Sequence, residues 1–240
     1  MTTRTMVRTA AGCAAGGAAL AVLGYATIAG AAWARYGRPP RARTPEEQDP
    51  LLDRFMPFYD IVERHHIQVE APAEVTFKAA RDLRMDGSCV ARAMFKGREL
   101  MLGAKPAPPP TGGMLDAMVS IGWGILADHP DREIVLGAVT RPWEPNPVFR
   151  EVLSSEFAAF EEPGFVKIAL TLRADPIGET QSIFRTETRA VATDARARSQ
   201  FRRYWALVSP GVALIRLSML GPIKADAERR VLADALVAQH

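Results

Sequence analysis

Residues 181–220 read QSIFRTETRAVATDARARSQFRRYWALVSPGVALIRLSML and decide the fold. Charged and uncharged side chains alternate from Ile183 to Val191, the pattern of a β-strand with two different faces. Asp194 then supplies a helix N-cap, because its carboxylate can accept a hydrogen bond from a backbone amide of the first turn. A strand that leads into a helix with a broad aromatic face is therefore predicted to form the core. The apolar side chains that recur on that face are Ala197, Phe201, Tyr204, Trp205 and Val208.

The segment before this stretch predicts a second strand. From Gly164 to Ala174 apolar and polar side chains alternate, so one face of the strand is expected to be buried. Asp175–Gly178 has the composition of a turn, and the two strands are therefore expected to pair antiparallel. The inward residues are expected to be Val166, Ile168, Leu170 and Leu172, and the outward ones Lys167, Thr171 and Arg173.

The rest of the chain predicts further strands and helices. Residues 103–113 are rich in proline and glycine and predict a loop, and Asp128–Asp131 predicts a hairpin turn. Pro210-Gly211 is expected to kink or restart the C-terminal helix, and Gly221-Pro222 to break it. The strands expected are Ile61–Val69, Ile121–Ala127 and Glu133–Val139, and the helices expected are Leu51–Tyr59, Ala73–Leu83, Ser88–Leu102 and Ile223–Val237.

Several motifs resemble those of the START-like superfamily, also called SRPBCC or polyketide cyclase/dehydrase-like proteins. Ala-Pro-x-x-Val-x-Phe occupies residues 71–77, between a predicted strand and a predicted helix. Thr186–Arg189, Tyr204-Trp205 and Pro210–Arg216 are similar to motifs of an uncharacterised bacterial branch of that superfamily. The resemblance extends over roughly residues 55–223.

This resemblance implies an α+β helix-grip fold. In that superfamily an antiparallel sheet wraps around the long C-terminal helix and leaves an apolar cavity between the two. The resemblance implies a pocket and no particular reaction. A hydrophobic small molecule or lipid is therefore the expected partner, and no cofactor is expected.

The N-terminal segment is predicted to cross a membrane. No charged residue occurs from Thr9 to Ala34. A helix of this length, at about 1.5 Å per residue, can cross a hydrocarbon core of about 30 Å. A signal-peptidase site at Ala32–Ala34 is the alternative, but the apolar region is longer than the usual signal-peptide core. We therefore expect residues 9–34 to remain as a single-pass anchor, preceded by a tail at residues 1–8.

Residues 35–54 are interpreted as a Pro/Arg-rich linker between the anchor and a START-like domain at residues 55–240. The arginines of the linker can lie on anionic lipid headgroups. They outnumber Arg4 and Arg8 on the other side of the anchor, which favours a cytoplasmic domain. The arginines counted here are the four within residues 35–50: Arg35, Arg38, Arg41 and Arg43.

Composition and motif spacing exclude several classes of site. The net charge of +3 is small and there is no zinc-finger, RNP or helix-turn-helix signature, so no nucleic-acid partner is expected. Neither a nucleophile motif such as Gly-x-Ser-x-Gly nor a metal motif such as His-Glu-x-x-His occurs. His65 and His66 fall in a predicted strand and point to opposite faces, so they cannot hold one metal. No catalytic residue and no metal ligand is assigned.

The candidate ligand-binding residues lie on the aromatic helix face, on the inward face of strand 164–174 and on the charged face of strand 181–192. On that charged face two arginines flank one glutamate, either as a structural network or as an anchor for an acidic ligand. A register slip of one residue reverses the face that meets the cavity, so both remain open. The candidates are Trp205, Phe201, Tyr204, Val208, Trp143, Ile168, Leu170, Arg185, Glu187 and Arg189.

Three functions fit these features. The first is non-catalytic binding of a lipid or other hydrophobic molecule, for which Trp205 is the leading pocket residue. The second is a cyclase-like or hydrolytic enzyme that uses the same cavity. The third is a membrane-tethered structural or interaction protein whose cavity is filled by its own side chains.

Overall fold

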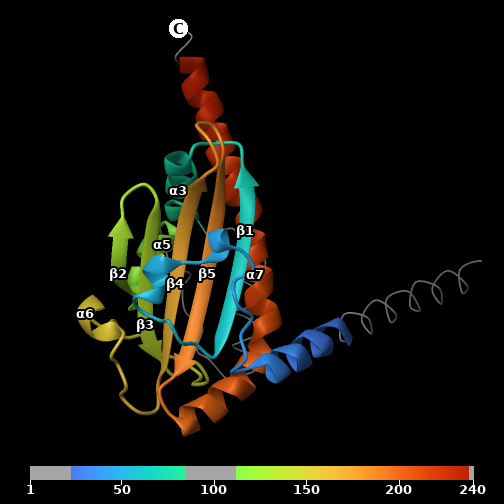
Figure 1. Cartoon of the computed structure of the whole chain (residues 1–240), viewed down its shortest axis with the longest axis vertical. Coiled ribbons are helices and arrows are strands. Elements are labelled where there is room, and N and C mark those ends of the chain that lie inside the picture. Colours follow the sequence, from blue (N-terminus) through green and yellow to red (C-terminus); the bar gives the residue numbers. More distant parts are fainter. Residues whose placement is uncertain (1–22, 85–111, 238–240) are drawn as a thin grey trace, which may run out of the picture.

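The computed structural model describes residues 23–84 and 112–237. Among these residues, five antiparallel strands form one sheet in the order β1-β5-β4-β3-β2, and a long C-terminal helix lies along one of its faces (Figure 1). The predicted α+β arrangement is therefore confirmed. The strands are β1 (Ile61–Val69), β2 (Gly124–His129), β3 (Glu133–Thr140), β4 (Val166–Pro176) and β5 (Ser182–Ala192). The helices are η1 (Pro45–Glu47), α2 (Pro50–Asp53), α3 (Ala73–Arg81), α5 (Met114–Ser120), α6 (Ser154–Phe157) and α7 (Ala195–Val237).

The predicted strands are present, and β1 has the bounds that the sequence predicted. The hairpin strands β2 and β3 each end one or more residues later than expected, and a bulge between Ile125 and Ala127 shifts their register. The predicted helix at 88–102 and most of the loop at 103–113 lie outside the described residues.

The sheet has two faces, because successive strand residues point to opposite sides. The inner face contacts α7, α3 and α5, and its side chains form the main hydrophobic core with Ile223 and Met219 of α7. Leu170 and Leu172 of β4 and Phe184 of β5 are completely buried there. Val166, Leu170 and Leu172 therefore point inward, as the alternation in β4 predicted, while Ile168 is partly buried against the same core.

The outer face of the sheet is covered by residues 36–56, which we call the N-terminal strap, and by α6. Leu52 and Met56 of the strap pack with Phe157 of α6 and Val135 of β3 in a second core. Most of the strap lies in the stretch interpreted from the sequence as a linker. Its leucines are buried, and this cover explains why the outward residues of β4 are buried as well: Lys167, Thr171 and Arg173.

Helix α7 begins at the predicted cap, since Asp194 Oδ1 accepts a hydrogen bond from Ala197 N at 2.8 Å. The helix crosses one end of the sheet and then turns to run beside β1 (Figure 1). Pro210 lies inside it and removes a backbone donor, a usual cause of such a bend. The predicted break at Gly221-Pro222 was wrong. Both residues are exposed there, and burial of the flanking Leu220 and Ile223 holds the helix in place.

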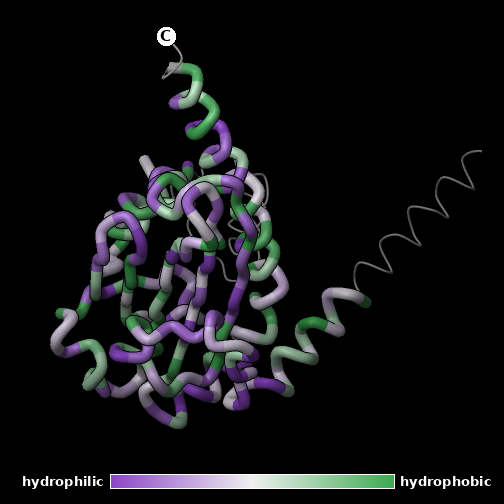
Figure 2. The backbone as a smooth tube through the Cα atoms, turned by 45° about the horizontal axis from the view of Figure 1, so that its top comes forward, coloured by the Kyte–Doolittle hydropathy of each residue, from purple (hydrophilic) through white to green (hydrophobic). Residues whose placement is uncertain are grey.

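Residues 23–35 form a helix that projects away from the sheet and is largely hydrophobic (Figures 1 and 2). Its C-terminal end contacts α7. Arg202 donates to the Trp33 carbonyl at 3.0 and 3.2 Å, and its guanidinium lies 4.2 Å from the Trp33 ring centroid. The Tyr25 hydroxyl also donates to the Leu207 carbonyl. The rest of the expected anchor lies outside the described residues.

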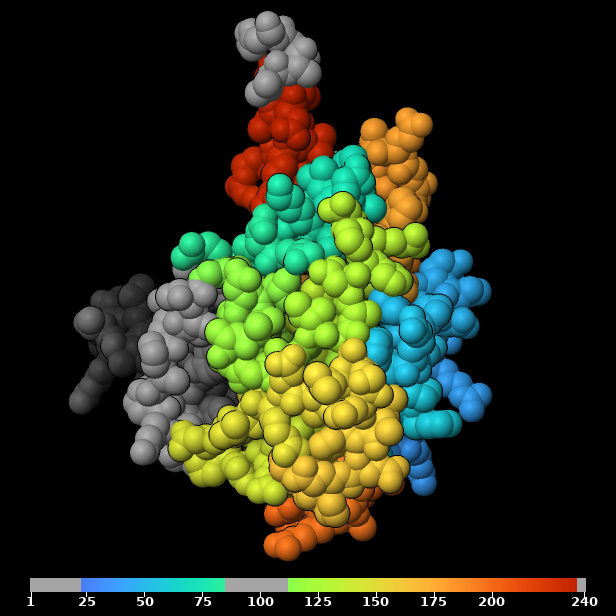
Figure 3. All heavy atoms as spheres, turned by 90° about the vertical axis from the view of Figure 1, so that its left-hand side faces the viewer, coloured from blue at the N-terminus to red at the C-terminus, as the bar shows by residue number. Residues whose placement is uncertain are grey.

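By length and hydropathy, one helix of the described part could cross a membrane, and it is α7. The inner side of α7 packs on the sheet, so the same composition suits the core helix of a soluble protein. Its C-terminal end stands clear of the rest of the described chain (Figure 3).

Candidate functional site

The charged residues of β5 lie on the outer face, away from α7. Glu187 is the cross-strand partner of Arg64 on β1, and Arg64 donates Nε and Nη2 to its two oxygens at 2.8 and 3.0 Å. Arg189 donates to the same carboxylate at 2.6 Å and to the Met56 carbonyl at 2.8 Å. Burial disfavours each charge, yet the hydrogen bonds to Glu187 raise the pKa of both guanidinium groups.

A second cluster lies further along the outer face. Asp175 accepts hydrogen bonds from Arg173 at 3.0 Å and from Arg185 at 2.9 Å. Arg173 also donates to the Glu46 and Gln48 carbonyls of the strap at 2.7 and 2.8 Å. The arginines of both clusters thus fasten the strap to the sheet, and this hydrogen bonding favours the structural interpretation of the charged face.

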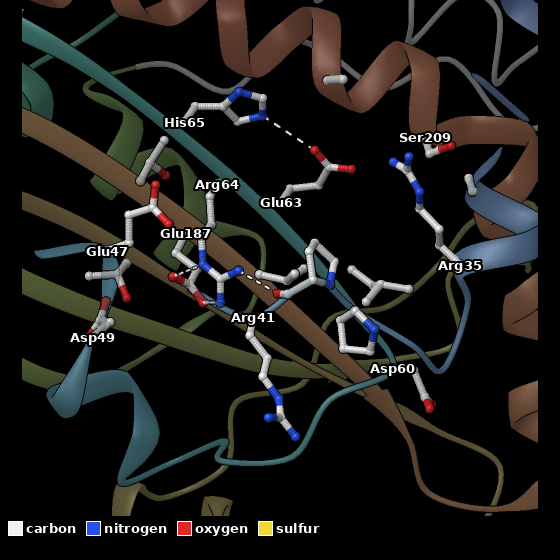
Figure 4. A pocket seen from close by; sticks show the side chains of 18 of the residues that line it. Arg35, Arg41, Glu47, Asp49, Asp60, Glu63, Arg64, His65, Glu187 and Ser209 are labelled. Atoms are coloured by element: carbon white, nitrogen blue, oxygen red, sulfur yellow. Dashed lines mark hydrogen bonds and ion pairs between the residues drawn. The ribbon is translucent and has the colours of Figure 1, made fainter. Parts of the chain in front are cut away.

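A pocket of about 440 Å³ lies where the edge strand β1 meets α7, the helix at 23–35 and the strap. We call it the β1 groove. It curves around β1, so that Glu63 and His65 border it on the α7 side and Arg64 and Glu187 on the other (Figure 4). Its apolar wall comes from three separate parts of the chain: Ile28, Ala31, Ala32, Ile61, Trp205 and Ala213.

The α7 side of the β1 groove carries a compact polar patch. His65 is the cross-strand partner of Thr186, and Glu63 is the partner of Thr188, so the four side chains share the inner face. His65 Nε2 lies 3.4 Å from Glu63 Oε2, within range of an ion pair. That contact does not have hydrogen-bond geometry, because Nε2 is buried without a hydrogen-bond partner.

Ser209 of α7 faces this patch across the β1 groove (Figure 4). Its hydroxyl and those of Thr186 and Thr188 are buried and have no hydrogen-bond partner among the described residues. The three residues are only 3%, 3% and 8% exposed. Buried polar groups normally have partners, so several unpaired groups around one space mark a place where a ligand or water can bind.

Arg216 lies further along the same side of α7 as Ser209. It falls in the apolar stripe between Val212 and Leu220, which face the cores, and it is half-buried. Burial lowers the pKa of Arg216 to about 10, and the charge of Glu63 opposes that shift only in part. No carboxylate of the described residues lies within ion-pair distance of it. Arg216 is thus a desolvated cation next to the polar patch.

The candidate residues divide between these regions. Trp205 borders the β1 groove and is 8% exposed. Phe201 is buried behind it, in a cluster that includes Tyr204, Val208, Trp143 and Ile168. Leu170 lies in the main core, Arg185 and Glu187 border the groove on the outer face, and Arg189 is buried in the network behind Glu187.

The polar patch was missed by the sequence reasoning. Thr186 and Thr188 were read only as the uncharged positions of a charged strand, and His65 only as a residue that cannot share a metal with His66. The available signal was Arg216, a charged residue at an apolar position of the helical stripe. No group of three or more His, Cys, Asp or Glu side chains suited to a metal occurs in the described residues.

Comparisons with known proteins find similar solved structures and no matching family. No protein-family model and no curated protein sequence matches the chain. Similar solved structures include a norcoclaurine synthase mutant from Thalictrum flavum, with 11% identity over 70% of this chain and 94% of that one and a TM-score of 0.35. The Zhui aromatase/cyclase from Streptomyces has 13% identity over 71% and 94% and a TM-score of 0.25. A hypothetical protein from Helicobacter pylori has 8% identity over 78% and 99% and a TM-score of 0.38.

Proposed function

We propose that this protein binds a lipid or other hydrophobic small molecule in the β1 groove. The observation that carries the proposal is a space of about 440 Å³ with an apolar wall built around Trp205 and Ile61. Small-molecule pockets of this size are mostly apolar and contain a few convergent polar groups, which the patch at His65 and Thr186 supplies. The binding is proposed to be non-catalytic.

The position of the β1 groove supports an apolar ligand that comes from a membrane. Ile28, Ala31 and Ala32 of the N-terminal helix form part of its wall. The same helix exposes Leu23 and Ile28, which are 62% and 51% accessible. We propose that residues 9–34 anchor the protein in a bilayer, so that a lipid can pass from the bilayer along this helix into the groove.

Native mass spectrometry of the full chain, purified from its host, tests the proposal. We expect a bound molecule of lipid size that is lost in Trp205→Ala, because this change removes a side chain from the groove wall. Trp123→Ala is the matched control. Trp123 is as buried as Trp205, at 7% exposure, but it stacks on Phe149 in the main core and does not border the groove.

Two results would contradict the proposal. An empty protein with the wild-type sequence would leave the structural alternative, in which the fold serves as a tethered interaction module. Equal ligand loss in Trp205→Ala and Trp123→Ala would show that occupancy follows stability and does not depend on the groove. Turnover of the bound molecule by the wild type would instead support the enzymatic alternative.

A further inference from the structure

The inner end of the β1 groove has an excess of positive charge. Arg35 borders it and points toward Ser209 (Figure 4). Arg216 lies two helical turns beyond Ser209 on the same side of α7, and its charge interacts with that of Glu63 in the polar patch. Neither guanidinium has an ion pair with a described residue. Among the described residues that border the groove, Glu63 is the one carboxylate on this inner side, and it lies 3.4 Å from His65. Asp60, at the end of β1, is already bound to Arg198 at 2.7 Å.

The same end of the groove has an excess of unused hydrogen-bonding groups. Thr186, Thr188 and Ser209 can each donate a hydroxyl proton, and His65 Nε2 is a further unpaired buried atom. A desolvated arginine together with several hydroxyl groups suits an acidic group, because charge-assisted hydrogen bonds form a matched fork with a carboxylate or phosphate. An uncharged apolar molecule would leave all of these groups unsatisfied.

We propose that the ligand of the β1 groove is an anionic amphiphile, whose acidic head lies between Arg216 and the hydroxyl groups of Thr186 and Thr188. The inference rests on the proposed function and adds the class and orientation of the ligand. The tail passes Ile61 and Trp205 and leaves the groove beside Ile28 of the exposed apolar helix. The head therefore points into the protein and the tail toward the membrane side.

The orientation follows from where the polar and apolar walls lie. Two of the three unpaired hydroxyl groups belong to Thr186 and Thr188 of β5, the strand next to the edge strand β1, and the third belongs to Ser209 of α7. Ala32 of the N-terminal helix packs in one cluster with Ile61 and Trp205, so the apolar wall is continuous from that helix to β1. A tail-in orientation would place methylene groups against Arg216 and Thr186 and leave the acidic head beside Ile28 and Ala32.

Titration calorimetry of the full chain in phosphatidylcholine nanodiscs tests the inference, with empty nanodiscs as the blank. The probes are decanoate, decyl phosphate and uncharged decanol, with acetate and inorganic phosphate as free anions. We expect at least one acidic probe to bind about 10- to 100-fold more tightly than decanol, the range of a buried charge-assisted hydrogen bond. Free acetate and phosphate should bind far more weakly, since they lack the tail.

Arg216→Met should remove most of that preference and leave the decanol affinity within about 3-fold, because it removes a desolvated charge and keeps the apolar stem. The Arg216→Met substitution should not lower Tm, since Arg216 has no ion pair with a described residue that could be lost. Arg203→Met is the control: this arginine lies on the exposed side of the same helix, and the preference should survive. Thr188→Val is a second variant of nearly unchanged shape and should reduce the preference about 3- to 10-fold.

Three results would overturn the inference. One is equal binding of decanol and both acidic probes by the wild type. This result would be compatible with the proposed function and would contradict only the inference that the ligand has an acidic head. Another is a preference that persists in Arg216→Met and in Thr188→Val. The third is binding of acetate or inorganic phosphate as tight as that of the decyl probes, which would show a free-anion site. Binding of none of the probes, decanol included, would contradict both proposals.

Discussion

Arg64 and Glu187 face each other across the β1–β5 ladder, and the guanidinium of Arg64 donates a hydrogen bond to each carboxylate oxygen of Glu187, at 2.8 and 3.0 Å. Arg64 also donates to the Pro40 carbonyl at 2.8 Å and to the Tyr59 hydroxyl at 3.0 Å. A single cross-strand pair therefore joins the edge strand to the strap. This pair forms part of the outer border of the β1 groove, so loss of the pair should change the shape of the groove on that side.

Replacing Glu187 should destabilise the protein without creating a cavity. In Glu187→Gln, Arg64 and Arg189 lose their shared negative charge while still buried or half-buried. We expect the free energy of unfolding to fall by about 2 to 3 kcal/mol. This is less than for a buried ion pair whose remaining partner has no other carboxylate, because Arg189 keeps its contact with Asp53. Thermal unfolding measures this change, and Glu179→Gln, at an exposed site, is the control. A Tm equal to that of the control would show that the network is not stabilising.

Stability should fall because of Glu133 as the pH rises from the ordinary carboxyl range to about 8. Burial, together with the neighbouring carboxylate of Asp49, raises the pKa of Glu133 to about 8. An acid whose folded-state pKa is raised binds more protons when folded than when unfolded. Its contribution to the free energy of unfolding is therefore complete below the ordinary carboxyl range and is lost as the pH rises through 8. Between pH 6 and pH 9 the wild type should lose about 1 to 3 kcal/mol relative to Glu133→Gln, which cannot ionise. Parallel pH profiles of Tm for the two proteins would contradict this assignment.

Gly122 should not accept a side chain. Its φ is +103°, and a Cβ there would run into the Phe149 carbonyl oxygen, a backbone atom that cannot rotate away. Gly122→Ala is expected to lower stability by roughly 2 to 4 kcal/mol, since the strain and the clash add. Gly178→Ala is the matched control, because a Cβ at Gly178 meets no atom within 4 Å and should change stability by less than about 0.5 kcal/mol. Similar Tm values for the two variants would show that the loop at Phe149 yields easily.

The N-terminal helix should remain in the mature protein. Cleavage after Ala34 would remove Trp33, whose carbonyl and ring both contact Arg202 of α7. N-terminal sequencing of the protein from its host should therefore find residues before Thr9, and carbonate extraction should leave the protein with the membrane. A mature chain that begins at Arg35 would instead indicate export.

The strands and the long helix could be predicted from the sequence because their signals are local. Alternation in Gly164–Ala174 and a carboxylate cap at Asp194 are set by neighbouring residues, and β4, β5 and α7 lie where those patterns place them. The bounds of β1 were likewise predicted. Pro222 was read as a break because local chemistry disfavours it, but packing of Leu220 and Ile223 against the sheet outweighs that preference.

The faces and the groove were decided by the tertiary structure alone. Alternation shows that Arg185, Glu187 and Arg189 share one face of a strand, but it cannot show which layer covers that face. The strap covers that face, and its backbone carbonyl groups accept hydrogen bonds from the arginines of the sheet. A backbone carbonyl is present at every residue, so the sequence does not show which ones an arginine will contact. The polar patch likewise needs β1 beside β5 and both opposite α7, because Glu63 lies beside Thr188 and interacts with the charge of Arg216, although the three are far apart in the sequence. The sequence by itself determined the strands and the start of the long helix, because hydrophobic periodicity and capping act over a few residues. The site depends on strand order and on the side of the sheet that α7 covers, and those are fixed only when the whole core packs.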